Sequence, residues 1–185
     1  MGQLTGKRVA ILTENGFEES ELTSPKKALE NAGAKVDIVS PEKGKVRAWD
    51  HDHWSQEIIV DKELKDADPK EYDALMIPGG VMNPDKMRQD KNCIDFAKHF
   101  MKTGKPIAAI CHAPQLLIET GMLKGRKLTS YPSLQTDLKN AGADWQNKEV
   151  VTDAGLVTSR SPKDLDAFNK KMIEEISEGK HARMN

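Results

Sequence analysis

Apolar and polar residues alternate along this chain in two regular ways, which predict strands and helices in turn. Short apolar runs are typical of buried strands, and apolar residues that recur every three to four positions are typical of amphipathic helices. The predicted strands are 8–13, 35–40, 73–78, 106–110, 127–130, 149–152 and 156–159. The predicted helices are 25–32, 85–102, 113–120, 134–141 and 162–178.

The order of these elements predicts the fold class. Strands that alternate with helices form a mostly parallel sheet with helices on both faces. We therefore expect an α/β, flavodoxin-like three-layer sandwich, in which residues 1–185 make a single domain with a core of about 7–178 and a short polar C-terminal tail. Ser24 and Ser161 each precede a proline, and we expect them to cap two of the helices.

The most informative segment is 106–118, where an apolar strand turns directly into an apolar helix at Cys111 and His112. A residue at such a turn is held in a strained, exposed position at the carboxyl edge of the sheet, which is the arrangement of a nucleophile elbow. The small residues Ala109 and Ala113 flank Cys111 at the spacing that a tight turn requires. We expect the helix N-terminus to lower the pKa of the thiol below its ordinary value of about 8.5.

A cysteine in an apolar run often serves only to fill a core. That reading fits Cys93, which shares a helical stripe with Phe100. Cys111 differs, because His112 follows it as a possible base and because Pro-Gly-Gly at 78–80 ends another strand at the same edge, where the backbone can approach closely. We therefore interpret Cys111 as a nucleophile.

Composition limits the function classes. Lys+Arg 28 against Asp+Glu 29 leaves no basic excess for nucleic acid or an anionic membrane. We find no apolar run of about 18 residues, as a membrane span requires, and no signal-peptide core. The two cysteines cannot form a disulfide framework, and a reactive thiol suits a reducing compartment, so we expect a cytoplasmic protein.

The turn after the first strand, residues 14–22, brings several carboxyl groups to the same edge of the sheet. Most carboxyl groups in such a turn are solvated or favour the helix N-terminus. One that is turned toward the thiol has to be at least partly protonated, so that it donates a hydrogen bond to the thiolate and supplies a proton in turnover. The residues by themselves leave Glu18 and Glu21 as alternatives.

The segment 49–54, Trp-Asp-His-Asp-His-Trp, raises the question of a metal site. Strand alternation would place His51 and His53 on one face and the aspartates on the other. Two ligands do not make a metal site, so we favour a polar hairpin or loop near the cleft and expect no metal and no cofactor. Its tryptophans are candidates for the wall of a substrate pocket or for a subunit contact.

Several motifs in order resemble the PfpI-like family of intracellular cysteine hydrolases, within the class I glutamine amidotransferase-like superfamily, which includes general stress proteins and reported deglycases. The resemblance covers residues 9 to about 176. The motifs that carry it are the acidic turn 17–25, Ile-Pro-Gly-Gly at 77–80, the elbow, and the segments 104–106, 123–126, 140–143 and 157–160.

The resemblance implies a role for several residues. By this resemblance Cys111 is the nucleophile, Glu21 is the carboxylic acid hydrogen-bonded to it, and the N–H groups of Gly80 and His112 form the oxyanion hole. In peptidase-like members the residue matching His112 is a base, with an acidic residue that matches Asp85 reaching it from a neighbouring subunit. The resemblance therefore also implies a homodimer or a higher homo-oligomer.

The chain departs from the family pattern in three places, which are two single residues and one loop. Ala113 stands where most members have glycine, and the loop 81–85 differs in length and residue type from peptidase-like members. Tyr131 stands where another branch of the superfamily has histidine, which leaves His112 as the nearby imidazole. We add Tyr131, Glu18 and Gly79 as candidates for substrate or oxyanion binding.

The expected function is that of a stress-response cysteine hydrolase that acts on small carbonyl-derived substrates, such as methylglyoxal or its adducts on Cys, Lys and Arg, in the manner of a deglycase or glyoxalase. One alternative is a cysteine peptidase. It requires His112 directed at Cys111, whereas a residue directly after the nucleophile generally points away. A second alternative is a redox-sensing or chaperone-like stress protein whose Cys111 is oxidised.

Overall fold

The computed structural model describes residues 2–182. Its strands are β1 (Arg8–Leu12), β2 (Phe17–Glu18), β3 (Lys35–Ser40), β4 (Lys45–Asp50), β5 (His53–Ile59), β6 (Lys62–Glu63), β7 (Ala74–Ile77), β8 (Ile107–Ile110), β9 (Lys127–Leu128), β10 (Asp144–Trp145), β11 (Val150–Asp153) and β12 (Leu156–Ser159). Its α-helices are α1 (Glu19–Asn31), α2 (Met82–Met87), α3 (Lys91–Thr103), α4 (Pro114–Ile118), α5 (Gln135–Asn140) and α6 (Leu165–Glu178). The predicted polar tail lies partly at 183–185, outside the described residues.

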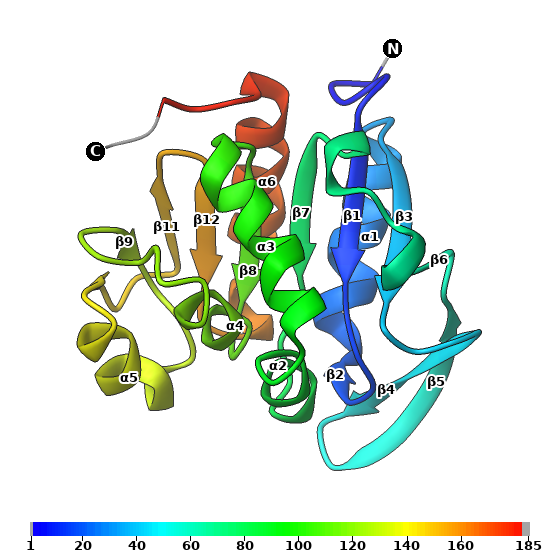
Figure 1. Ribbon diagram of the computed structural model, residues 1–185, viewed down its shortest axis with the longest axis horizontal. Helices are drawn as coiled ribbons and strands as arrows, with labels where there is room; N and C mark the ends of the chain where they lie inside the picture. Colours follow the sequence, from blue (N-terminus) through cyan, green and yellow to red (C-terminus); the bar gives the residue numbers. More distant parts are fainter. Residues whose placement is uncertain (1, 183–185) are drawn as a thin grey trace.

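A seven-stranded sheet in the order β11-β12-β8-β7-β1-β3-β6 forms the centre of the molecule. Neighbouring strands within this sheet run parallel, except that β11 runs antiparallel to β12. The carboxyl ends of β1, β7 and β8 lie at its lower edge in Figure 1, next to α2 and the β4–β5 hairpin. That edge is where ligands bind in open parallel sheets.

Alternate residues of the central strands face opposite sides of the sheet, and each side has its own apolar core. Ala10 and Leu12 of β1 pack on the side of α3 and α4, whereas Val9 and Ile11 pack on the side of α1 and α6. Figure 1 shows the first helix pair in front of the sheet and the second pair behind it. The predicted three-layer α/β sandwich with a mostly parallel sheet is confirmed.

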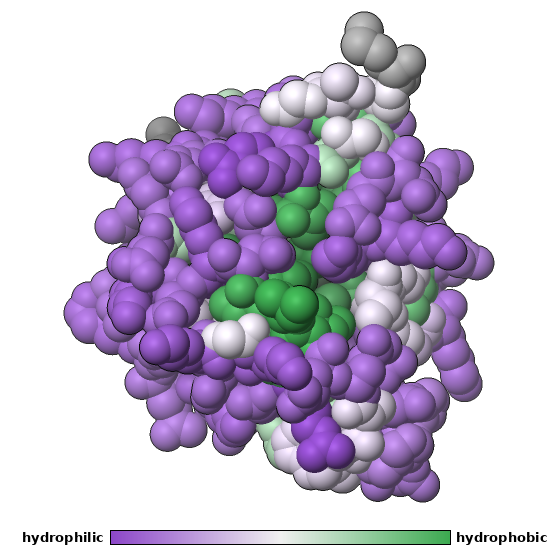
Figure 2. Space-filling view, turned by 90° about the vertical axis from the view of Figure 1, so that its right-hand side faces the viewer, coloured by the Kyte–Doolittle hydropathy of each residue, from purple (hydrophilic) through white to green (hydrophobic). Residues whose placement is uncertain are grey.

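The face of the molecule that carries β3, β6 and the β4–β5 hairpin is mostly polar (Figure 2). Figure 2 views the molecule from the side of β3, β6 and the hairpin, where polar side chains surround a central apolar area. This agrees with the 31% of charged residues in the sequence. Within residues 2–182, no helix combines the length and the apolar character that a membrane crossing requires.

The first helix starts earlier than the sequence pattern predicts. Helix α1 begins at Glu19, directly after β2 pairs with β4, so the predicted Ser24 cap is wrong and Pro25 lies inside the helix. Proline removes one helical hydrogen bond. Because Pro25 shares the buried face with Leu22 and Leu29, its packing offsets part of that loss.

Two further boundaries differ from prediction. The predicted helix 85–102 is two helices, because Asp90 leaves helical geometry and its side chain accepts the N–H of Asn92 at 2.8 Å, which caps α3. The predicted helix 162–178 begins as a 3₁₀ turn at 162–164 and becomes α-helical at Leu165. Ser161 makes no side-chain cap there, so that prediction is also wrong.

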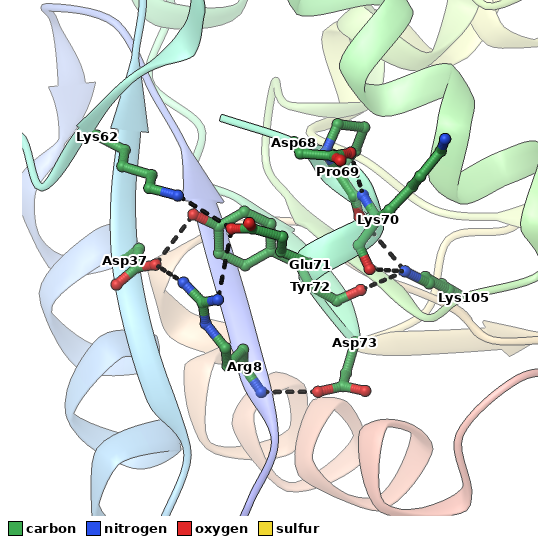
Figure 3. A network of polar contacts seen from close by, with 10 residues as sticks. All are labelled: Arg8, Asp37, Lys62, Asp68, Pro69, Lys70, Glu71, Tyr72, Asp73 and Lys105. Carbon is green, nitrogen blue, oxygen red and sulfur yellow. Dashed lines mark hydrogen bonds and ion pairs between the residues drawn. The ribbon is translucent and has the colours of Figure 1, made fainter. Parts of the chain in front are cut away.

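The amino edge of the sheet, opposite the candidate site, is joined by a polar network (Figure 3). Arg8 donates to Asp37 at 2.9 Å, and the Tyr72 hydroxyl donates to the same carboxyl at 3.0 Å, which links β1, β3 and the segment before β7. Lys105 Nζ donates to the carbonyl oxygens of Pro69, Lys70 and Tyr72. Burial lowers the pKa of Lys105.

Replacing Lys105 tests whether this network contributes to the stability of the fold but not to activity. Lys105→Met leaves partly buried carbonyl oxygens without their donor, so we expect the free energy of unfolding to fall by about 1–3 kcal/mol. Activity should not change, because the residue lies at the edge opposite Cys111. Lys102→Met, at an exposed position of α3, is the matched control. Urea unfolding measures the effect, and equal stability of the two variants would contradict the prediction.

Candidate active site

Cys111 lies at the end of β8 in a left-handed backbone conformation, with φ of 62°. Its N–H donates to the carbonyl of Ser159 on β12 at 3.0 Å, and its carbonyl accepts the N–H of Tyr131 at 2.9 Å. A non-glycine residue rarely holds a positive φ unless its surroundings enforce it. The turn between β8 and α4 therefore has the strained geometry of a nucleophile elbow.

The choice between Glu18 and Glu21 is made by their surroundings. Glu21, in the first turn of α1, is fully buried, and its Oε2 accepts the N–H of Gly79 at 2.9 Å. A side chain on Gly79 would place its Cβ 2.3 Å from that oxygen and 2.7 Å from the Cβ of Cys111. Glu18 is partly exposed and accepts the N–H of His51 instead.

The electrostatics of this buried pair differ from the expectation of a lowered thiol pKa. Burial raises the pKa of Glu21 to about 8, so its carboxyl group is mostly protonated at neutral pH. Burial, and after it the carboxyl of Glu21, raise the pKa of the Cys111 thiol, whereas the N–H groups of Gly80 and His112 lower it only in part. Helix α4 spans only Pro114–Ile118, so it adds little field of its own.

The backbone N–H groups of Gly80 and His112 lie near enough to the sulfur of Cys111 to lower the pKa of its thiol. Gly80 has φ of 80°, and a Cβ there would lie 2.6 Å from the carbonyl oxygen of Gly16. Glycine is thus required for the loop 78–80 to approach the turn after β1. Two backbone donors of this kind can stabilise a developing oxyanion.

His112 does not point away from the nucleophile, contrary to expectation. Its Nδ1 lies 3.2 Å from Sγ of Cys111, and its Nε2 lies 3.3 Å from the hydroxyl of Ser133. The imidazole stacks on the ring of Tyr131 with centroids 4.6 Å apart. Burial lowers the pKa of His112, so the ring is neutral and able to accept a proton.

Cys111, Glu21 and His112 lie at a cleft of about 760 Å³. The β4–β5 hairpin forms one wall, in which Trp49 and Trp54 pack edge to face with centroids 5.3 Å apart. The cleft is also lined by residues that the sequence did not mark as site candidates, namely Gly16, Val81, Met82, Ser161, Pro162 and Lys163. Their place at the cleft follows from the fold, which brings their segments together.

The hairpin does not place its histidines as the strand pattern predicts. His51 lies in the turn with φ of 56°, whereas His53 begins β5. Each ring contacts the preceding aspartate: His51 lies 2.6 Å from Asp50, and His53 lies 2.7 Å from Asp52. The expectation that the aspartates face away is therefore wrong, since these carboxyl groups raise the pKa of both exposed rings.

Asp85 is not brought to the site within one chain. It lies exposed on α2, and within residues 2–182 its side chain makes no hydrogen bond to His112. By contrast, Cys93 is buried in the core against α3 neighbours, as predicted. Burial raises the pKa of the Cys93 thiol, which makes it a poor nucleophile.

A three-layer α/β sandwich thus brings an elbow cysteine, a buried glutamic acid and the loop 78–80 together at the carboxyl edge of its sheet. The model of the DJ-1/PfpI family matches residues 7–175. The chain therefore belongs to the DJ-1/PfpI family.

Similar proteins carry different names. The chain is 44% identical over 167 residues to a putative cysteine protease, YraA, of Bacillus subtilis, covering 90% of this chain and 96% of the relative. It is 44% identical over 169 residues to general stress protein 18 of the same organism, covering 91% and 96%. It is 42% identical over 168 residues to protein/nucleic acid deglycase 2 of Escherichia coli, covering 90% and 96%.

Solved structures show the same fold. Drosophila melanogaster DJ-1beta aligns with a TM-score of 0.84 and 31% identity, covering 96% of this chain and 91% of that one. A two-domain protein of Anabaena variabilis, with DJ-1/ThiJ/PfpI-like and ferritin-like domains, aligns with a TM-score of 0.86 and 36% identity. The match covers 92% of this chain and 48% of that one, so this chain spans about half of the two-domain protein.

The buried acid predicts a distinctive pH dependence of stability. Between pH 4.5 and about 8 the folded protein retains the Glu21 proton that the unfolded chain releases. The stabilisation that the protonated Glu21 contributes below pH 4.5 is therefore lost as the pH rises toward 8, by at most roughly 1.4 kcal/mol per pH unit. Glu21→Gln cannot titrate, so its free energy of unfolding should fall less over this window.

Urea unfolding at pH 5, 7 and 9 measures this difference. Glu149→Gln, which removes an exposed carboxyl group, is the matched control and should follow the wild-type protein. A Glu21→Gln curve parallel to the wild-type curve would show that Glu21 ionises normally in the folded protein.

Proposed function

We propose that this protein is a cysteine hydrolase of the deglycase or glyoxalase type, which acts on small carbonyl-derived substrates with Cys111 as nucleophile and Glu21 as proton shuttle. The observation that carries the proposal is the buried pairing of the two side chains. A carboxylic acid whose pKa is about 8 holds a transferable proton at neutral pH. Relatives named as a deglycase and as a general stress protein support this choice.

In the proposed reaction the sulfur of Cys111 attacks the electrophilic carbon of the substrate. The new C–S bond forms as the carbonyl electron pair moves to oxygen, and the N–H groups of Gly80 and His112 stabilise the resulting oxyanion. As the C–S bond forms, Glu21 transfers its proton to that oxygen, or to the amine whose C–N bond breaks, and takes up the proton that the thiol releases. Water then attacks the same carbon, the C–S bond breaks and a proton of the water returns to the sulfur, so acid and nucleophile return to their starting state.

The size of the cleft supports an adduct as substrate. Ligand pockets commonly measure about 300–1,000 Å³, and 760 Å³ is far more than a small free aldehyde fills. The indole walls of Trp49 and Trp54 suit the aliphatic part of a modified side chain. Glu18 offers a carboxyl group at the same cleft for a nearby amine or guanidinium.

Substitution of the two central residues tests the proposed chemistry. Cys111→Ala should abolish turnover of methylglyoxal and of glycated amino acids, and Glu21→Gln should lower kcat by about 10²–10⁴-fold, because the amide cannot transfer a proton. Wild-type kcat should fall as the pH rises through about 8, where Glu21 loses its proton. Steady-state assays from pH 5 to 10 measure these effects.

Cys93→Ala is the matched control, since it removes the other thiol without touching the cleft. It should retain kcat. If the wild-type protein turns over no carbonyl substrate while peroxide oxidises Cys111 and changes partner binding, Cys111 acts as a redox sensor and the hydrolase proposal fails.

Peptide hydrolysis is the second candidate, favoured by the 3.2 Å approach of His112 Nδ1 to the Cys111 sulfur. A neutral imidazole at that distance can act as the base of a thiol-imidazole pair. The relative named as a putative cysteine protease supports this reading. In this function Asp85 of a second subunit would orient His112, so we propose a homodimer for it.

His112 separates the two candidates. For the deglycase-type reaction, His112→Gln should lower kcat by less than about tenfold, far less than Glu21→Gln, because the backbone N–H remains. Asp85→Ala should have a modest effect, and sedimentation should show a dimer. Hydrolysis of a fluorogenic peptide by the wild type and its loss in His112→Gln would instead establish the peptidase, whereas a fully active monomer would exclude a shared site.

A further inference from the structure

Asn83 is a fully buried amide in α2 that binds two loops of the active-site edge at once. Its Nδ2 donates to the carbonyl oxygens of Pro78 at 2.9 Å and of Gly79 at 3.2 Å. Its Oδ1 accepts the N–H of Glu14 at 2.7 Å and the hydroxyl of Thr13 at 3.3 Å. With its donors and its acceptor all engaged, the buried amide fixes the geometry of both loops.

The two carbonyl groups that this amide binds belong to peptide units that serve the catalytic pair. The C=O and the N–H of a trans peptide point in opposite directions, and the described residues contain no cis peptide bond. The C=O of Pro78 shares a unit with the N–H of Gly79, which donates to Glu21. The C=O of Gly79 shares a unit with the N–H of Gly80, which lies near both the sulfur of Cys111 and the carboxyl group of Glu21 and lowers the pKa of each.

Glycine on both sides leaves the peptide unit between Gly79 and Gly80 free to rotate in the absence of other contacts. Rotation of the unit between Gly79 and Gly80 would turn its carbonyl oxygen, instead of its N–H, toward the sulfur. The oxyanion would then lose one donor and meet a negative dipole. Asn83 opposes this rotation, because its amide holds the carbonyl oxygen on the far side.

We propose that Asn83 is a positioning residue, which keeps the N–H groups of Gly79 and Gly80 directed at Glu21 and Cys111. Among the described residues, its hydrogen bonds reach neither of these two side chains, so it acts on them through the loop 78–80. Its part in turnover rests on the proposed cysteine hydrolase function. The hydrogen bonds to the two carbonyl groups are independent of any substrate.

Asn83→Ala removes both donors, and Asn83→Asp fills the same space with an acceptor that repels the two carbonyl oxygens. We expect either variant to lower kcat by about 10–100-fold and to change KM by less than about threefold, because the misplaced N–H acts mainly in the transition state. The midpoint of Cys111 alkylation by iodoacetamide should move to higher pH, since the thiolate loses a donor.

Asn169→Ala is the matched control. Asn169 is a partly buried amide on α6 whose Nδ2 donates to Ser24 Oγ at 2.9 Å, far along the chain from the loop 78–80. Its substitution should destabilise the fold while leaving kcat and the alkylation midpoint unchanged. Thermal unfolding of each variant relates any activity loss to stability.

Unchanged kcat and an unchanged alkylation midpoint in a folded Asn83 variant would overturn the proposal. If Asn83→Ala does not fold, the isosteric Asn83→Asp carries the same test. Alkylation requires no substrate, so a protein that turns over no carbonyl compound fails the proposed function but still shows whether Asn83 positions the loop. A KM effect larger than the kcat effect would also overturn the proposal, because it indicates a binding role.

Discussion

The burial of one carboxyl group, that of Glu21, constrains the rest of the site. No described cation neutralises it, so burial raises its pKa to about 8 and keeps its proton in place at neutral pH. Its Oε2 accepts the N–H of Gly79, which requires the loop 78–80 to lie against the first turn of α1. The same burial brings the acid to the sulfur of Cys111. A single desolvated group therefore joins three segments that are far apart in the sequence.

Stability and chemistry are placed at opposite edges of the sheet. The amino edge is joined by the hydrogen bonds of Arg8 to Asp37 and of Lys105 to the carbonyl oxygen of Tyr72. The carboxyl edge instead leaves two N–H groups directed at a thiol and holds Cys111 in a left-handed conformation. Parallel sheets favour this division, because all their carboxyl ends meet at one edge.

Two features of this site support the two proposed reactions. The glutamic acid beside Cys111 favours chemistry that needs a proton donor, whereas the imidazole of His112 near the sulfur favours chemistry that needs a base. The two residues approach the sulfur from different segments, α1 and the elbow. A substrate that uses the first route needs an electrophilic carbon that is already activated, as in a carbonyl adduct, whereas an amide needs stronger activation of the nucleophile.

The sequence by itself determined the central strands of the sheet, the two helix layers and the elbow, because apolar periodicity and a strand that meets a helix at Cys111 are local signals. It missed the edge strand β6, and the predicted strand 127–130 pairs with β10 in a separate sheet. The sequence did not determine where the first helix starts. Helix α1 begins at Glu19 rather than after Ser24, because pairing of β2 with β4 fixes where the chain turns, and this contact is not local.

Only the tertiary structure decided which carboxyl group faces the thiol, where the imidazole points and how the thiol titrates. Each depends on burial and on distances between segments, which no residue spacing encodes. The choice of Glu21 over Glu18, the 3.2 Å approach of His112 and the raised thiol pKa all follow from such contacts. The role of Asn83 lies beyond the sequence for the same reason, because its partners are the backbone groups of two loops that meet only in the folded protein.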